Sequence, residues 1–294
     1  MSHTVLVLPE AQLAPLLRAY DAAIAAKQRQ LVIGLLLGAG ALALSVIGAE
    51  VDPAKFWENI GNFTSYFSRL SHLDSGDYVW TDPAEWFWGI KRWSLLLGET
   101  IMIAYVGTLT GSVFGFVGSF LCSRNLVKSV ALRLAVRRAL EFCRTVPDIV
   151  FAMIFVIAFS LGPLPGVLAI TIHTTGALGK LFSEVVESIN MKPVEGIAAT
   201  GGSWLAQMRY GVVPQVLSNF ASYALLRFEV NVRGATVIGF VGAGGIGEDL
   251  IVAIRKFFYS DVSAILLMIV VCVMLIDTIS EKLRHRLLAM DSGR

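Results

Sequence analysis

A run of nineteen residues without a charge, residues 31–49, constrains the fold of this chain more than any other feature. At about 1.5 Å per residue, a helix of this length crosses a hydrocarbon layer of about 30 Å. The composition agrees, because 55% of the residues are hydrophobic and 16% are charged, whereas soluble domains carry roughly 25% charged residues. The sequence therefore predicts an all-α, polytopic membrane protein and excludes a disordered chain or a disulfide scaffold.

Six segments are predicted to cross the membrane. Residues 31–49 form the first, which lies too far from Met1 and is too long to be the core of a cleaved signal peptide. The others are residues 94–121, about 147–161, 167–182, about 214–233 and 262–279. Between the third and the fourth, residues 162–166 (GPLPG) predict a short turn, because prolines and glycines disfavour a continuing helix. Six crossings place both termini on one side.

The distribution of lysine and arginine predicts the orientation. Sixteen of them fall in segments on the side of the termini, whereas residues 50–93 hold four, beside seven acidic residues and five of the six tryptophans. Both termini are therefore expected in the cytoplasm. Residues 50–93 are expected to lie along the outer interface as short helices, where indole rings favour the headgroup level. A formal net charge of +2 gives no electrostatic footprint for nucleic acid.

The remaining boundaries follow from this topology. Residues 1–30 predict a cytoplasmic amphipathic helix, with Leu17, Tyr20 and Ile24 on one stripe, that lies on the membrane surface or packs on a soluble partner. Residues 94–282 form the membrane core, with a long cytoplasmic loop at 183–213, and residues 283–294 form a cytoplasmic tail. The three cysteines lie in or beside apolar segments at no metal-like spacing.

Residues 242–247 (GAGGIG) match the G-x-G-x-x-G pattern of dinucleotide-binding proteins. That site needs a parallel sheet around it, and the segments that flank these glycines are predicted membrane spans. We therefore interpret Gly244 and Gly245 as part of a non-helical backbone segment at membrane depth, enclosed by protein or by a water-filled cavity, as in transport pathways. A glycine-rich loop at the outer surface is the alternative.

The cytoplasmic loop at 183–213 carries a spaced motif. Pro193 suits the first turn of a helix, Glu195 complements its positive N-terminus, and Gly201 ends it after about two turns. Glu195 is followed six residues later by Gly201 and thirteen after that by Pro214, which resembles the EAA loop of ABC importer permeases. The helix is expected over about residues 194–200 and, being too short to be stable alone, is expected to dock on another surface. The chain departs from the usual motif at Gly196, Ile197, Gly211 and Val213.

Two further stretches resemble phosphonate-type permeases of this class. One is residues 173–180 (HTTGALGK), and the other is residues 227–233 (RFEVNVR) with the glycine-rich segment that follows. The resemblance covers roughly residues 94–288. It implies a type I ABC importer (MetI-like) permease fold in a bacterial inner membrane, and the import of phosphonate or a related phosphorus oxyanion.

The resemblance also implies partners. The complete importer would contain a second copy of the chain, two ABC ATPase subunits and an extracytoplasmic phosphonate-binding protein. The resemblance implies that Glu195, Gly201 and Pro214 couple the ATPase to the spans. ATP and Mg²⁺ would bind in the ATPase, because this chain has no G-x-x-x-x-G-K-[ST] motif. No cofactor or catalytic residue is expected in this chain. No metal is expected either, because no second His, Cys or carboxylate stands at metal-ligand spacing from His173.

Polar residues within the spans are candidates for the solute pathway, because charges at membrane depth are costly. Glu229 and Arg233 have the favourable i,i+4 order and predict a structural ion pair. Arg227, which forms a second i,i+4 pair with Asn231 on the other face, is then the better candidate to meet a phosphorus oxyanion through its guanidinium fork. His173 and Thr174 are expected to hydrogen-bond between helices or to solute. Packing or interfacial charges are the alternative for all of them.

Two other functions remain open on the sequence. A secondary transporter for a small anion, driven by an ion gradient, would have no need of a loop that docks an ATPase. An intramembrane enzyme would need a convergent acid, base and nucleophile, and the sequence predicts no such group. The EAA-like loop therefore favours the ABC permease.

Overall fold

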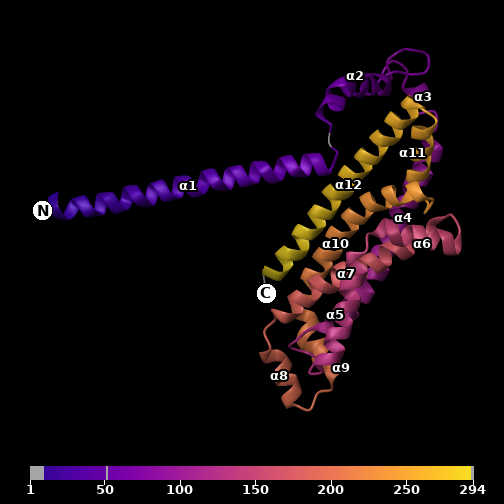
Figure 1. Ribbon diagram of the computed structural model, residues 1–294. Coiled ribbons are helices and arrows are strands. Elements are labelled where there is room, and N and C mark those ends of the chain that lie inside the picture. The colour runs from indigo at the N-terminus through magenta and orange to yellow at the C-terminus, as the bar shows by residue number, and fades with distance from the viewer. Residues whose placement is uncertain (1–9, 51, 293–294) are drawn as a thin grey trace, which may run out of the picture. The chain divides into compact units, whose positions relative to one another are not determined.

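The computed structural model describes residues 10–50 and 52–292. Every regular element in these two ranges is a helix, and the only other pairing there is one isolated β-bridge between His72 and Tyr78. The predicted all-α class is therefore confirmed (Figure 1). The chain divides into two units, one ending at Ser65 and one beginning at Tyr66, and each is described by itself.

The first unit contains α1 (Glu10–Gly48) and most of α2 (Pro53–Leu70). α1 is one continuous helix, so nothing interrupts it at the boundary predicted near residue 30. Its segment Leu17–Gly48 is long and apolar enough to cross a membrane. α2 is one of the short helices predicted for residues 50–93. The first nine residues of the predicted surface helix lie outside the described residues.

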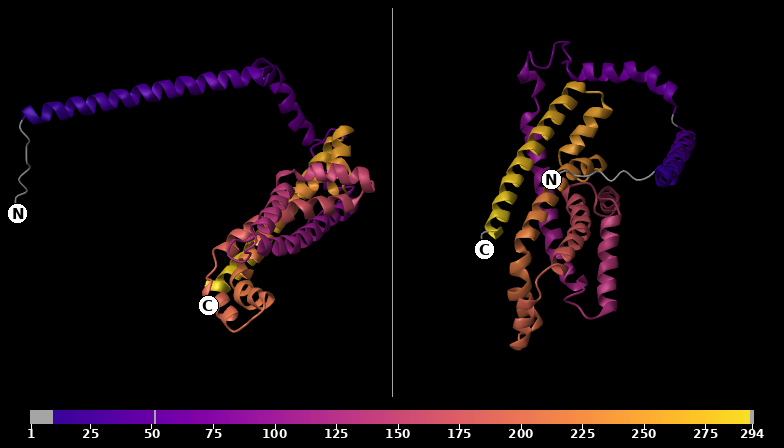
Figure 2. Two further views of the ribbon diagram at one scale, coloured as in Figure 1. Left: turned by 60° about the horizontal axis from the view of Figure 1, so that its bottom comes forward. Right: turned by 90° about the vertical axis from the view of Figure 1, so that its left-hand side faces the viewer.

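α4 (Ile90–Cys122) and α7 (Pro163–Glu187) form the centre of the second unit. A Cβ at Gly107 would lie 2.6 Å from Cγ2 of Ile170, and one at Gly111 would lie 2.7 Å from Cβ of Thr174. Because these glycines are four residues apart and share one face, the two helices approach closely. α10 (Val213–Ile238) packs on both helices, and α12 (Tyr259–Ser292) lies along α10 (Figure 2).

The described ranges contain three helices that are long and apolar enough to span a membrane, and two bent pairs that could each form one more span. α4 and α12 coincide with the predicted second and sixth spans. α5 (Val130–Thr145) and α6 (Asp148–Phe159) meet at an angle of 87°. α6 has only 12 residues, so residues 147–161 do not form a span by themselves.

The other bent pair joins the helical run Trp204–Val241, which contains α10, to α11 (Ile246–Arg255) at an angle of 51°. α7, which coincides with the predicted fourth span, is not among the candidates by length and composition. Its apolar run is interrupted by His173, Thr174 and Lys180, and neighbouring helices bury much of it. Length and composition thus account for up to five of the six predicted crossings.

The turn before α7 differs from the prediction. The chain reverses at Ser160 and Gly162, whose φ angles are 73° and 137°, and Pro163 already begins α7. Proline fits this position because the first helical turn has no intrahelical acceptor for an N–H group. Residues 163–166 are therefore helical, and the prolines start the helix instead of preceding it.

Within the second unit, the short segment at residues 83–88 contains α3 (Pro83–Trp86) and contacts α12. Nε1 of Trp86 donates to Ser263 at 3.0 Å, and Nε1 of Trp88 donates to Asp261 at 2.8 Å. The indole groups of this segment therefore hold it against the first turns of α12.

Candidate functional site

A buried polar node joins the three central helices. Nδ2 of Asn231 on α10 donates to Oγ1 of Thr108 on α4 at 2.7 Å and to Oγ1 of Thr174 on α7 at 2.9 Å. All three residues are buried, and Thr174 is fully so. A buried amide keeps its place only where its hydrogen bonds are made, so this Asn231 node fixes how α4, α7 and α10 meet.

Next to this node, the structure brings together two residues predicted separately. A guanidinium nitrogen of Arg227 on α10 donates to Nδ1 of His173 on α7. Asp148, at the start of α6, interacts electrostatically with both side chains. Nε of Arg227 is buried and has no partner in the described part of the chain. The guanidinium is thus held in place with donor capacity to spare.

The predicted ion pair between Glu229 and Arg233 is wrong. Arg233 reaches Oδ1 of Asp277 on α12 at 3.5 Å, and its Nε donates to the backbone oxygen of Glu229 at 3.3 Å. The carboxylate of Glu229 is buried, and its Oε1 has no partner among the residues described. The i,i+4 spacing permits a pair, but α12 offers Arg233 an acceptor from another helix.

The predicted pairing of Arg227 with Asn231 is also not formed, because each side chain has a partner on another helix. Arg227 binds His173, and Asn231 binds the two threonines of the node. The placement of Arg227 and Glu229 on different faces of α10 holds, since Arg227 faces α7. His173, Thr174 and Arg227 therefore form one group, from which Glu229 and Arg233 are absent.

The glycine-rich segment is a break in the helical run, as predicted, and it is buried. Gly242, Gly244 and Gly245 have φ angles of 84°, 85° and 82°. A Cβ at Gly245 would lie 2.4 Å from Oγ1 of Thr100 on α4, and that hydroxyl accepts a hydrogen bond from the N–H of Ile246 at 2.9 Å. The segment is therefore packed inside the protein, against the alternative of an outer surface loop.

Gly244 lies against residues other than those that form the Arg227 group. A Cβ at Gly244 would lie 2.9 Å from Oε1 of Glu99 and 3.0 Å from Pro163. The segment thus joins α4 and the first turn of α7. The dinucleotide-binding interpretation has no support, because the described ranges contain no strand around these glycines.

The predicted loop helix is present as α8 (Lys192–Ala199), with Pro193 in its first turn and Gly201 at a φ of 79° just after it. Val194 is buried, and a Cβ at Gly211 would lie 3.0 Å from its Cγ2. The departure from the usual motif at Gly211 thus lets α8 pack closely. α8 is held by its own chain, so its short length does not by itself require a partner surface, while Glu195 remains exposed.

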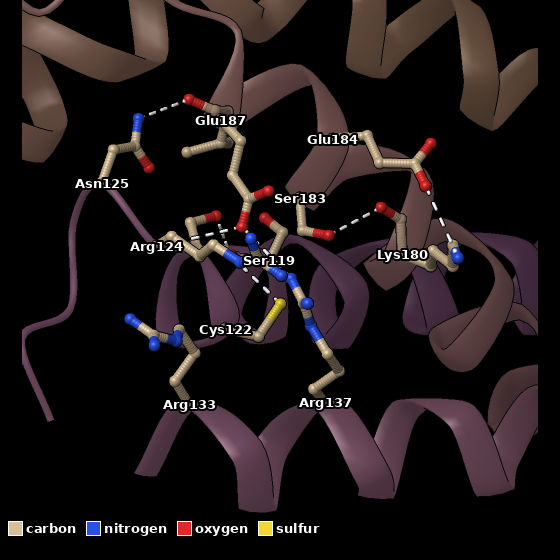
Figure 3. Close-up of polar contacts among 12 residues, drawn as sticks. Ser119, Cys122, Arg124, Asn125, Arg133, Arg137, Lys180, Ser183, Glu184 and Glu187 are labelled. Carbon is tan, nitrogen blue, oxygen red and sulfur yellow. Dashed lines mark hydrogen bonds and ion pairs between the residues drawn. The ribbon is translucent and has the colours of Figure 1, made fainter. Parts of the chain in front are cut away.

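A set of polar contacts that the sequence did not predict anchors the chain just before this loop (Figure 3). Oε1 of Glu187, the last residue of α7, accepts from Arg137 on α5 at 3.2 Å and from the N–H of Arg124 at 3.0 Å. Nδ2 of Asn125 donates to the backbone oxygen of Val186 at 2.7 Å. The end of α7, which leads into α8, is therefore tied to the connection between α4 and α5.

Within the described ranges, no group of three or more His, Cys, Asp or Glu side chains could hold a metal ion. What the site offers is a guanidinium and an imidazole between α7 and α10, and an exposed carboxylate on α8. The guanidinium and the imidazole can bind an anion. The carboxylate of Glu195 on α8 can contact a basic surface.

A family model described as "Binding-protein-dependent transport system inner membrane component" matches residues 107–287. The chain is 39% identical over 198 residues to the phosphite transport system permease protein PtxC of Stutzerimonas stutzeri, covering 67% of this chain and 72% of that protein. It is 35% identical over 197 residues to the phosphate-import permease protein PhnE of Mycolicibacterium smegmatis, covering 67% and 37%. It is 55% identical over 117 residues to the putative cryptic phosphonate transport system permease protein PhnE2 of Escherichia coli K12, covering 40% and 96%.

Solved structures show the same fold. A chain of the inward-facing MetNI methionine ABC transporter aligns with a TM-score of 0.58 and 18% identity, over 70% of this chain and 98% of that chain. A chain of a bacterial ABC transporter that imports the acidic polysaccharide alginate aligns with a TM-score of 0.57 and 13% identity, over 82% and 95%. At these identities the likeness concerns the fold alone.

Proposed function

Because the chain belongs to the family of binding-protein-dependent transport system inner membrane components, we propose that it is the membrane-spanning permease subunit of an ATP-driven ABC importer. Its cargo is phosphonate or a related phosphorus oxyanion. The names of the relatives described above include the words phosphite, phosphate and phosphonate. The chain itself is a transport subunit and not an enzyme.

The observation that carries the choice of cargo is the contact between Arg227 and His173. A guanidinium binds phosphorus oxyanions through two parallel N–H groups, and Arg227 has a buried Nε without a partner in the described part of the chain. Thr174 lies beside His173 and is fixed by Asn231. In this proposal Arg227 contacts the oxyanion, His173 orients Arg227, and the Asn231 node holds the helices around them.

In this proposal, α8 is the contact through which ATP hydrolysis by the ATPase subunits is coupled to the membrane spans. Glu195 stands exposed in the first turn of this helix, and Gly201 and Pro214 bound the loop, so the outer face of α8 is free to meet an ATPase subunit. The anchoring of Glu187 links this loop to α4 and α5. The complete importer contains two copies of this chain, two ATPase subunits that bind ATP and Mg²⁺, and an extracytoplasmic binding protein that delivers the oxyanion.

The chain resides in a bacterial inner membrane with both termini in the cytoplasm. The excess of lysine and arginine on the side of the termini supports this orientation. Labelling of single cysteines introduced at Arg133 and Glu195 is expected only from the cytoplasm, and labelling at Asp74 only from outside. Labelling of position 74 from the cytoplasm would contradict the orientation.

Purification in mild detergent from a native host tests the proposal as a whole. We expect an ATPase with a P-loop to co-purify with the chain, and a soluble binding protein encoded with it to carry a phosphorus oxyanion. If the chain purifies without an ATPase and an ion gradient alone drives its transport of an anion, it is instead a secondary transporter.

A further inference from the structure

A cavity of about 180 Å³ lies between α5 and α7, beside the last residue of α4. It shares no lining residue with the Arg227 group. This volume has room for several waters or for a small oxyanion. Its charged lining consists of Arg137, Glu141, Arg144, Lys180, Glu184 and Glu187. Figure 3 shows Arg137 extending from α5 toward Glu187 on α7, and Lys180 extending toward Glu184.

The charges in this lining are not all matched. Arg137 pairs with Glu187 at 3.2 Å, and Lys180 pairs with Glu184 at 3.6 Å. Glu141 pairs with Arg138, which is outside the lining. Arg144 has no ion-pair partner among the residues that the structure describes. The lining holds three cations and three carboxylates and is formally neutral. Because Glu141 is paired from outside the lining by Arg138, Arg144 is the lining cation that is left without an ion-pair partner within the described ranges.

The cavity continues the polar face of α7 that begins at His173. Lys180 follows His173 by seven residues, and Glu187 follows Lys180 by seven, a spacing that keeps all three on one side of the helix. A Cβ at Gly176 would lie 2.5 Å from the backbone nitrogen of Arg144, so the end of α5 touches α7 between His173 and Lys180. Arg144 therefore lines the cavity and also lies beside the turn of α7 that follows His173.

We propose that this cavity binds a phosphate-type oxyanion, with Arg144 as its main ligand and Lys180 as its second. The guanidinium of Arg144 supplies a cation without an ion-pair partner among the described residues and a fork of donors. The Lys180–Glu184 pair is half-exposed and long, so little stability is lost when Lys180 turns toward an anion. The proposed function guides only the choice of a phosphorus oxyanion. A free anion and the headgroup of an anionic phospholipid present the same chemistry.

Binding of radiolabelled inorganic phosphate to the purified full-length chain tests the site. Arg144→Gln removes the unpaired guanidinium. Arg133→Gln removes the same charge from the same helix, at a residue that neither lines the cavity nor pairs with one of its carboxylates. We expect Arg144→Gln to weaken phosphate binding about tenfold or more, since a charge-assisted hydrogen bond is lost, and Arg133→Gln to bind as the unaltered chain does. Arg144→Lys, which keeps the charge, should recover part of the affinity.

The matched variant Arg227→Gln separates this proposal from the proposed function. We expect it to retain binding that depends on Arg144 while it loses uptake in the assembled importer. Equal phosphate binding by Arg144→Gln and Arg133→Gln would overturn a free-anion site in the cavity and would leave the proposed role of Arg227 standing.

Native mass spectrometry from nanodiscs distinguishes the two sources of the oxyanion. With phosphatidylglycerol present, retention of this lipid by the Arg133→Gln chain and its loss from the Arg144→Gln chain would identify a headgroup as the occupant. Phosphate binding that is the same in phosphatidylcholine and phosphatidylglycerol nanodiscs would identify the free anion. If neither phosphate nor phosphatidylglycerol binding depends on Arg144, the cavity is not an oxyanion site.

Discussion

Arg227 on α10 donates a hydrogen bond to Nδ1 of His173 on α7, a residue 54 positions earlier in the chain. The imidazole therefore acts as the acceptor and holds the guanidinium in one orientation. Nε of Arg227 is buried without a partner in the described ranges. A cation fixed by one nitrogen, with another donor unused, is preorganised for an anion.

Arg227→Lys should lower oxyanion uptake by about tenfold or more. Lysine keeps the charge but loses the planar fork, and a hydrogen bond to a charged group is worth about 1.5–3 kcal/mol. Arg233→Lys on the same helix, where the arginine faces Asp277, should change uptake little. Uptake is measured in vesicles that contain the complete importer, and equal uptake by the two variants would remove Arg227 from the pathway.

Asn231→Leu should destabilise the chain by about 1–3 kcal/mol, because it leaves the buried hydroxyl of Thr174 without its partner. Thr278→Val serves as the control, since that hydroxyl is exposed and bonds only to its own helix. Its effect should stay within about 0.5 kcal/mol. Thermal unfolding in detergent measures both, and similar midpoints would show that the node does not hold the helices together.

Gly245→Ala should destabilise the chain by about 2 kcal/mol or more. A Cβ at this position meets Oγ1 of Thr100 at 2.4 Å, and the φ of 82° disfavours any other residue. Gly98→Ala in α4 meets nothing within 4 Å and should be neutral or slightly stabilising. If the two variants unfold at the same temperature, the glycine-rich segment is not packed against α4.

The sequence predicted those parts of the fold that depend on local pattern. The long apolar run gave α4 to within four residues at either end, and the Pro193 and Gly201 signals gave α8 to within two. α6 was misjudged because an apolar run does not reveal a bend of 87° beside it. Pro163 was misread because proline both ends one helix and starts the next.

Contacts between distant residues could not be predicted in the same way. Arg227 and His173 were each named as candidates, but nothing local indicates that they touch. Arg233 was assigned to Glu229 because the two are four residues apart, whereas its acceptor is Asp277, 44 residues away. The four-residue spacing of Gly107, Gly111 and Gly115, each of which lies against α7, was a local signal for the contact of α4 with α7.

Glu195→Gln and Gly201→Asp should both weaken recruitment of the ATPase, or uncouple its hydrolysis from uptake, while the chain inserts normally. Glu195→Gln removes the charge and keeps the shape, and Gly201→Asp adds bulk and charge at a φ of 79°. Lys192→Gln, in the same exposed turn, is the matched control. Co-purification of the ATPase and its phosphate release per anion imported measure the effect, and wild-type coupling in both variants would assign the docking surface elsewhere.

The most direct test of the permease assignment is uptake of radiolabelled phosphite, phosphate and methylphosphonate into vesicles that contain this chain, its ATPase and its binding protein. Uptake of at least one of these anions should require ATP on the side of the membrane where the ATPase binds. It should also require the binding protein on the opposite side. It should persist when ionophores collapse all ion gradients. Uptake that continues without the ATPase and stops when the gradients collapse would contradict the assignment.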